Sequence, residues 1–307
     1  MSGKPIIAGR GPWQLAFERL RNDRTAIACA VTLVATVLVA IAAPLLAQMT
    51  GHSPIEQFGE AGLSPTGIPV GPGSEFWLGA DGLGRDVLVR IAYGTRISLL
   101  VGVVASTLAV IIGAAVGITA GWFGGAIDNF LSRFMDGVLS LPFLVLALAL
   151  AALVGPSLGV SIFLIVFFSW ASIGRVIRAQ TRSIRDREYV QAARALGAGN
   201  LRVMLVELLP VVSPTIIVYA TLLIPSAIAF EATLSFLGLG VPPPTPTWGN
   251  MLADAMAYYK VAWWLLLFPG AALLTVTYTF NVLGDSLRDA LDPRHDQTIR
   301  STGGDDE

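Results

Sequence analysis

The sequence contains 307 residues, of which 54% are hydrophobic and 13% are charged, and its formal net charge is −1. Because soluble domains contain about 25% charged residues, this composition excludes an ordinary soluble protein and indicates an all-α integral membrane protein. One cysteine and two histidines are too few for a disulfide framework or a zinc site, and the charge balance indicates no nucleic-acid partner. Neither lysine follows the glycine pattern of a phosphate-binding loop, so if ATP drives this protein, another chain binds it.

The N-terminal third predicts an anchor helix and a long loop. Residues 1–25 are a polar, basic flank. Residues 26–95 comprise a first transmembrane helix and a long outer loop, because the apolar run 26–47 can cross roughly 30 Å of hydrocarbon and the rest is rich in Gly and Pro.

Three charged residues lie close together near the end of this outer loop: Asp81, Arg85 and Asp86. They could form a local charge network at the mouth of the second span. A structural role that fixes the loop and a role toward the substrate are equally open.

Five further spans follow within a permease core of residues 96–285, before a polar tail at 286–307. Each is close to the 20 residues that a membrane helix needs. Their predicted ranges are 97–120, 137–154, 157–173, 211–230 and 263–283. In the second span a glycine recurs every four residues, which predicts close packing of another helix at Gly113, Gly117 and Gly121. Kinks are predicted within spans at Pro142, Pro214, Pro225 and Pro269.

The loop at 175–210 carries seven of the twenty Lys and Arg residues of the chain. We expect two short helices in it, separated by a turn at Gly197, where glycine can adopt a positive φ. The first is predicted to begin at Ser183, with Asp186 completing a capping box, and the second to be capped by Asn200. The apolar face of the second helix is predicted at Leu201, Met204, Leu205 and Leu208.

The distribution of basic residues predicts the topology. Six spans place both termini and the loop at 175–210 on one side, which holds sixteen Lys and Arg residues, whereas the other side holds four. The positive-inside rule therefore predicts that both termini and this loop are cytoplasmic.

Between the fifth and sixth spans, Glu231 is the charge that lies nearest to the interior of a span. Counting along the helix places it near the outer interface. A gate or path residue and a carboxylate at a helix end are equally open, and Trp248 further along the same connection is a second candidate for the path or gate.

A resemblance to a known family rests on four blocks of sequence. Gln191, Ala192 and Ala193, followed by Gly197 and Pro210, resemble the EAA loop of bacterial ABC-importer permeases, although Gln191 replaces Glu and Glu207 replaces Ile. The blocks at 78–102, 121–136 and 231–252 are similar to the permease of the dipeptide, oligopeptide and nickel importer family that has a long first outer loop. The resemblance covers about residues 10–295.

This resemblance implies a six-transmembrane-helix type I ABC importer permease fold in a bacterial inner membrane. It implies four partners: a homologous second permease, two cytoplasmic ATP-binding subunits and an extracytoplasmic substrate-binding protein. This chain would be non-catalytic and would carry no cofactor, because ATP and Mg belong to the partner subunits. A coupling helix that docks on an ATPase would contain or adjoin the candidate residues Tyr189, Gln191, Ala192, Ala193, Leu196, Gly197 and Pro210.

Several alternatives remain open from the sequence. The cargo implied is a di- or oligopeptide, with nickel or another small solute as the alternative. A self-sufficient secondary transporter or channel would use Asp136 and Glu231 as ion sites. A membrane enzyme would need a catalytic constellation, which the sequence does not provide.

Overall fold

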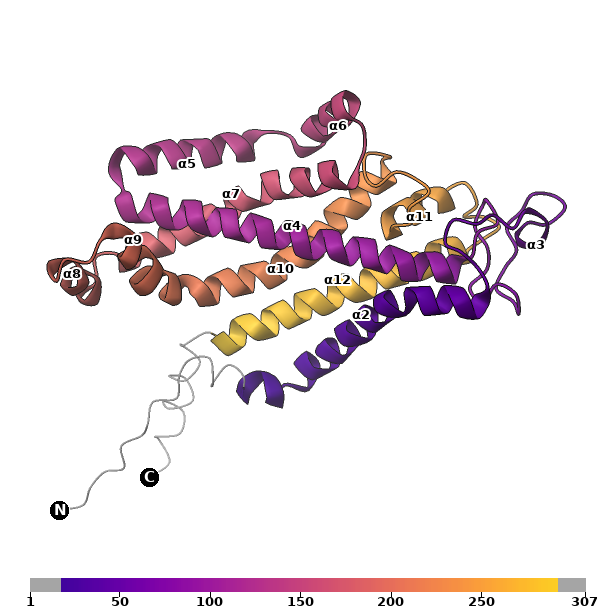
Figure 1. The fold of residues 1–307 in the computed structure, drawn as a ribbon, viewed down its shortest axis with the longest axis horizontal. Coiled ribbons are helices and arrows are strands. Elements are labelled where there is room, and N and C mark those ends of the chain that lie inside the picture. The colour runs from indigo at the N-terminus through magenta and orange to yellow at the C-terminus, as the bar shows by residue number, and fades with distance from the viewer. Residues whose placement is uncertain (1–17, 292–307) are drawn as a thin grey trace, which may run out of the picture.

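The structure is a computed structural model that describes residues 18–291, so most of the predicted N-terminal flank and C-terminal tail lie outside the described residues. Within this range the regular elements are helices, and the long ones run side by side along one axis (Figure 1). Five are long and apolar enough to cross a membrane, or six if one bent pair forms a single span. The predicted all-α membrane fold is confirmed. The long helices are α2 (Arg24–Thr50), α4 (Val87–Phe123), α7 (Leu158–Ile184), α10 (Leu209–Phe236) and α12 (Trp264–Leu291).

The third span, predicted at 137–154 with a kink at Pro142, is divided at that kink. The chain forms α5 (Gly125–Ser140) and α6 (Phe143–Val154), which meet at an angle of 81° and count as one span only if the bent pair is taken together. The break lies at Pro142, which lacks a backbone N–H and disfavours helical geometry in Leu141 before it. Leu141 is accordingly extended, with φ −74° and ψ 133°. Pro142 therefore ends one helix and begins another, whereas Pro214, Pro225 and Pro269 lie inside helices as predicted.

The predicted glycine stripe packs α4 closely against α7. A Cβ atom on Gly113 would lie 2.6 Å from the carbonyl oxygen of Trp170, and one on Gly117 would lie 2.6 Å from that of Gly174. Because real Cβ atoms do not approach backbone oxygen so closely, only glycine permits this separation of the two helices.

Replacing Gly117 by alanine is expected to lower the thermal denaturation midpoint of the purified protein. The added methyl group must push α4 from α7, and such overpacking costs about 1 to 3 kcal/mol. Gly137→Ala is the matched control, because an added Cβ there meets no atom within 4 Å. Equal midpoints for the two variants would contradict the close contact.

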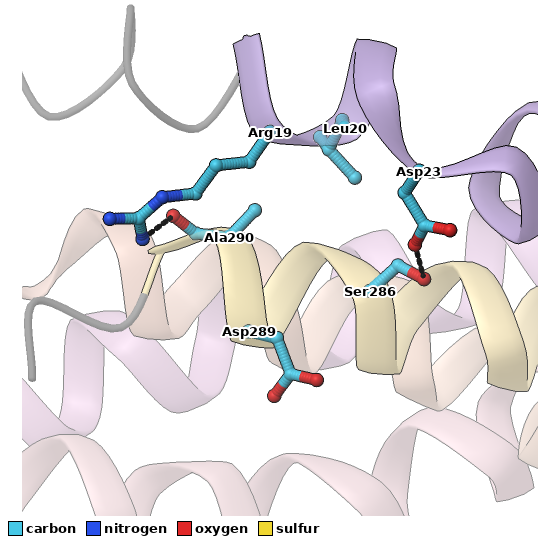
Figure 2. Close-up of a pocket in the computed structure, with 6 residues that line it drawn as sticks. All are labelled: Arg19, Leu20, Asp23, Ser286, Asp289 and Ala290. Atoms are coloured by element: carbon cyan, nitrogen blue, oxygen red, sulfur yellow. Dashed lines mark hydrogen bonds between the residues drawn. The ribbon is translucent and has the colours of Figure 1, made fainter. Parts of the chain in front are cut away.

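The first span is held against the last. Asp23 accepts a hydrogen bond from the backbone N–H of Thr25 at 2.9 Å and so caps α2, and it also accepts one from Ser286 of α12 at 3.0 Å (Figure 2). These hydrogen bonds lower the pKa of the Asp23 carboxyl, and the bond from Thr25 has a larger effect than the bond from Ser286. Arg19 donates to the carbonyl of Ala290 at 3.2 Å, which satisfies an open carbonyl at the end of α12. These contacts form a clasp between the first and last described helical segments.

The loop at 175–210 contains one short helix and not two. α7 continues to Ile184, so Ser183 lies inside a helix, where its hydroxyl donates to the carbonyl of Gln180 at 2.7 Å. The predicted capping box at Ser183 is therefore wrong. α8 (Glu188–Ala195) is the short helix.

The second predicted helix is the beginning of the fifth span. α9 (Asn200–Arg202), the π-helix η1 (Val203–Leu208) and α10 form one continuous run. Asn200 is the first residue of α9 and does not cap the helix as predicted. The N-cap position is occupied by Gly199, which has no side chain to donate or accept a capping hydrogen bond.

The apolar face predicted for this segment is also incorrect. Leu208 is fully buried as expected, but its buried companion is Val203, whereas Leu201 and Leu205 are 68% and 54% exposed. A π-helix bonds each residue to the fifth one along, so the four-residue spacing used for the prediction does not apply here.

Candidate functional site

The candidate coupling residues gather at one end of the molecule. α8 lies beyond the ends of α4 and α7, toward the end where α2 begins and α12 ends (Figure 1). The opposite end carries α3 (Gly59–Gly62), α11 (Trp248–Ala255) and the outer loop. The arrangement of helices agrees with the predicted number of crossings, and the cytoplasmic assignment of this end stays a prediction.

One face of α8 is anchored in the molecule. Val190 is fully buried in a cluster that includes Ile184 and Val203. The guanidinium carbon of Arg194 lies 5.3 Å from the ring centroid of Trp122 at the end of α4, within the range of a cation–π contact. Sequence reasoning missed both contacts, and the one between Arg194 and Trp122 joins residues that are distant along the chain.

The other face of α8 is open. Ala192 and Gln191 are exposed, Tyr189 is 39% exposed, and Leu196 directly after the helix is 89% exposed. This face of α8 is therefore not covered by the rest of the described chain and is accessible to a partner. Ala193 is partly buried, and Pro210 lies in the first turn of α10, apart from α8.

Gly197 ends α8 in the predicted left-handed conformation, with φ +88°. The N–H of Gly197 donates to the carbonyl of Arg194 at 2.9 Å, and that of Ala198 donates to the carbonyl of Ala193 at 3.1 Å. These two bonds form a Schellman motif, which satisfies the last carbonyls of the helix. An added Cβ at Gly197 would meet no atom within 4 Å, so backbone conformation and not space requires glycine here.

Gln191 has a structural use that the sequence did not reveal. Its amide nitrogen donates to the carbonyl of Asp186 at 3.0 Å and braces the segment that leads into α8. An ionised glutamate has no proton to donate, so this bond suits the amide that stands here in place of the usual Glu.

Two ion pairs join α5 to α7 at the same end. Arg178 makes a bidentate pair with Asp128, one of whose bonds measures 2.8 Å, and Arg175 donates to Asp136 at 2.5 Å. Asp136, which a secondary transporter would use as an ion site, is thus paired with Arg175. Because the Asp136 carboxylate is already paired with an arginine, it does not resemble the open ion site that a secondary transporter would need.

At the other end of the molecule, two of the three residues of the predicted charge network, Asp81 and Arg85, form an ion pair, whereas Asp86 lies in a different cluster. Asp81 accepts from Arg85 at 2.7 Å and lies 3.2 Å from Nε of Arg90, while Arg85 also reaches Asp254 of α11 at 3.3 Å. Arg85 and Arg90 are 4% and 2% exposed, so Asp81 compensates two buried cations. Burial raises the pKa of the half-exposed Asp254 carboxyl, and the two arginines oppose that shift.

Asp86 belongs to a separate cluster. Its Oδ1 accepts from the backbone N–H of Leu88 at 2.8 Å and caps α4, and its Oδ2 lies 2.6 Å from Nδ1 of His52. The imidazole ring stacks on Phe76, with ring centroids 4.8 Å apart. The Asp86 cluster therefore fixes the end of α2 to the start of α4.

Glu231 and Trp248 are both enclosed by the chain. Glu231 is fully buried in the last two turns of α10, where it accepts hydrogen bonds from Ser235 at 2.7 Å and from Ser98 of α4 at 3.3 Å. Trp248 is 1% exposed at the start of α11 and packs with Ile228. Neither side chain is presented to an open surface here, and a path or gate role for them stays a prediction.

Comparisons with known proteins agree with one another. Residues 109–297 match the family described as "Binding-protein-dependent transport system inner membrane component", and residues 11–63 match the "N-terminal TM domain of oligopeptide transport permease C". The chain is 41% identical to the dipeptide transport system permease protein DppC of Alkalihalophilus pseudofirmus, over 92% of this chain and 90% of that protein. It is 36% identical to the oligopeptide transport system permease protein OppC of Escherichia coli, over 95% of each.

Among solved structures, a chain of the MetNI methionine ABC transporter in an inward-facing conformation has a similar fold. The TM-score is 0.55 at 18% identity, and the match covers 66% of this chain and 96% of that one. This similarity supports the type I ABC importer permease fold alone. The sequence matches carry the assignment further: the chain belongs to the binding-protein-dependent transport system inner membrane components, and among them to the DppC/OppC-like permeases of bacterial ABC importers.

Proposed function

We propose that this chain forms half of the translocation path of an ATP-driven peptide importer and that α8 is its docking element for a cytoplasmic ATPase. The observation that carries the proposal is the combination of an anchored and an open face on α8. Relatives named as dipeptide and oligopeptide permeases support peptides as the cargo. The second permease, two ATPases and an extracytoplasmic binding protein complete the proposed assembly.

The structure suggests how a displacement of α8 would reach the spans. Val190 and the Arg194–Trp122 contact attach α8 to the ends of α7 and α4. After the cap at Gly197, the chain enters the continuous helix from Asn200 to Phe236. A movement imposed on α8 is therefore passed to α4 and α10, which contact each other through Ser98 and Glu231. ATP binding and hydrolysis would occur on the partners, and alternating access would follow from the movement of the spans.

A bulky substitution on the open face tests the docking surface. Ala192→Trp is expected to insert normally into the membrane and to lose copurifying ATPase, because an indole at an exposed alanine prevents close approach of the helix backbone. Ser183→Trp, at an exposed position near the end of α7, is the matched control. Full ATPase recovery with Ala192→Trp would overturn the assignment of α8.

The cargo needs its own measurement. ATP-dependent uptake of a labelled dipeptide and of nickel ion, measured side by side in liposomes that contain the full assembly, distinguishes the two alternatives. Uptake of dipeptide alone is expected. Uptake of nickel alone would reject the peptide assignment and retain the docking role of α8.

A further inference from the structure

A cavity of about 480 Å³ lies between α7, α10 and α12, at the end of the molecule that carries α8. Its size falls within the range of small-molecule sites. It is separate from α8 and from the outer charge network. The side chains that line it include Arg288, Gln180, Thr215 and Tyr219.

Two polar side chains of this cavity, Arg288 and Gln180, have no side-chain partner among the described residues. Within residues 18–291, Arg288 makes no ion pair and the Gln180 side chain makes no hydrogen bond. Gln180 lines the cavity, and its Oε1 atom is buried without a donor. No carboxylate is among the described side chains that line the cavity. Such a wall suits an anion.

The lining residues are ordered by depth in the membrane. Arg288 and Leu291 lie in the last turn of α12, Gln180 lies in the last two turns of α7, and Thr215 lies near the start of α10. Deeper by one to two turns, the wall is formed by the apolar side chains of Val176, Val218 and Leu222 together with Tyr219. The order from the surface inward is therefore cationic, polar and then largely apolar.

We propose that this cavity binds the headgroup and upper acyl chain of an anionic phospholipid from the leaflet on the side of α8. The phosphate would meet Arg288 and the Gln180 amide, and the acyl chain would cover the deeper apolar wall. A peptide path would need polar groups along its length, whereas this cavity loses most of them with depth. The site thus favours a lipid over the transported cargo.

Lipid retention by the purified full-length chain tests the proposal without requiring transport. The chain is reconstituted in nanodiscs of phosphatidylcholine and phosphatidylglycerol at roughly three to one, extracted in mild detergent, and analysed by native mass spectrometry. Phosphatidylglycerol is expected to be enriched on the wild-type chain. Arg288→Gln is expected to lower the enrichment about fivefold, which corresponds to one cationic contact at a membrane surface.

Matched variants separate this site from general attraction of charge. Arg182→Gln removes an exposed cation from the last turn of α7, outside the cavity, and is expected to keep the enrichment. Val218→Phe fills the cavity without changing charge and is expected to lower the enrichment, whereas Ile217→Phe on the exposed side of α10 is not. Equal losses in both arginine variants, or none in Val218→Phe, would overturn the proposal.

Two other possible occupants of the cavity, inorganic phosphate and residues 292–307, would give different results in the lipid-retention experiment. Complete displacement of the lipid by millimolar inorganic phosphate would show a phosphate site to which the acyl chain contributes nothing. Lipid enrichment that develops only after deletion of residues 292–307 would show that this segment is the occupant. Either result contradicts a lipid site, and an enrichment that survives phosphate and is present in the full-length chain supports it.

Discussion

Gly197→Val is expected to yield a chain that inserts into the membrane and fails to retain the ATPase. Valine at φ +88° carries a β-branched side chain in the left-handed region, which costs about 1 to 3 kcal/mol locally. The Schellman bonds from Gly197 and Ala198 would be lost, and α8 would no longer hold its position relative to Asn200. Copurification of ATPase with a tagged chain measures the effect.

Gly199→Val is the matched control for this prediction. Gly199 lies two residues away, has φ −69°, and likewise has no atom within 4 Å of an added Cβ. Valine fits that backbone conformation, so ATPase retention is expected to stay near wild type. Retention at wild-type level in Gly197→Val as well would show that the cap does not position the docking helix.

Asp81→Ala is expected to cause the largest loss of stability on the outer side. It leaves Arg90 buried without its carboxylate and Arg85 with the half-exposed Asp254 alone, and an uncompensated buried charge costs about 3 to 5 kcal/mol. It also removes the acceptor for the backbone N–H groups of Leu83 and Arg85. The expected result is a lower denaturation midpoint and faster proteolysis of the loop between α2 and α4, with ATPase association intact.

Asp254→Ala provides the comparison within the same network. The Asp254 side chain is 50% exposed and pairs with Arg85 at the longer distance of 3.3 Å, so its loss is expected to cost at most about 1 kcal/mol. Equal destabilisation by the two aspartate variants would show that burial of the arginines does not decide the energetics. Loss of ATPase association in Asp81→Ala would indicate that the two ends of the molecule are coupled.

Hydropathy predicted the spans well, because about 20 consecutive apolar residues have few alternatives to a membrane helix. It could not locate their ends. The polar last turns of α7 continue the helix to Ile184 since Ile177, Thr181 and Ile184 pack inside the protein. Pro142 was recognised as a kink, but the 81° change of direction depends on contacts that local sequence does not encode.

The charged sites were predicted only where the partners are close in sequence. Asp81 and Arg85 are four residues apart, and their pairing was expected. His52 and Asp86 are 34 residues apart, and Arg85 and Asp254 are 169 apart, so neither pair has a signal in a single sequence. For the same reason the sequence assigned Asp86 to the wrong cluster. The cap at Gly197 was predictable because its chemistry is local.

The clasp at Asp23 and Ser286 joins residues that are 263 positions apart. Because the ribosome synthesises α2 well before α12, the first span acquires this neighbour only after α12 has been made. Until then α2 lacks its contact with α12 and keeps its contact with α4, and Asp23 keeps its hydrogen bonds from Thr25 but lacks the one from Ser286. Closure of the clasp therefore follows the synthesis of α12, and a chain truncated before α12 lacks this partner for its first span.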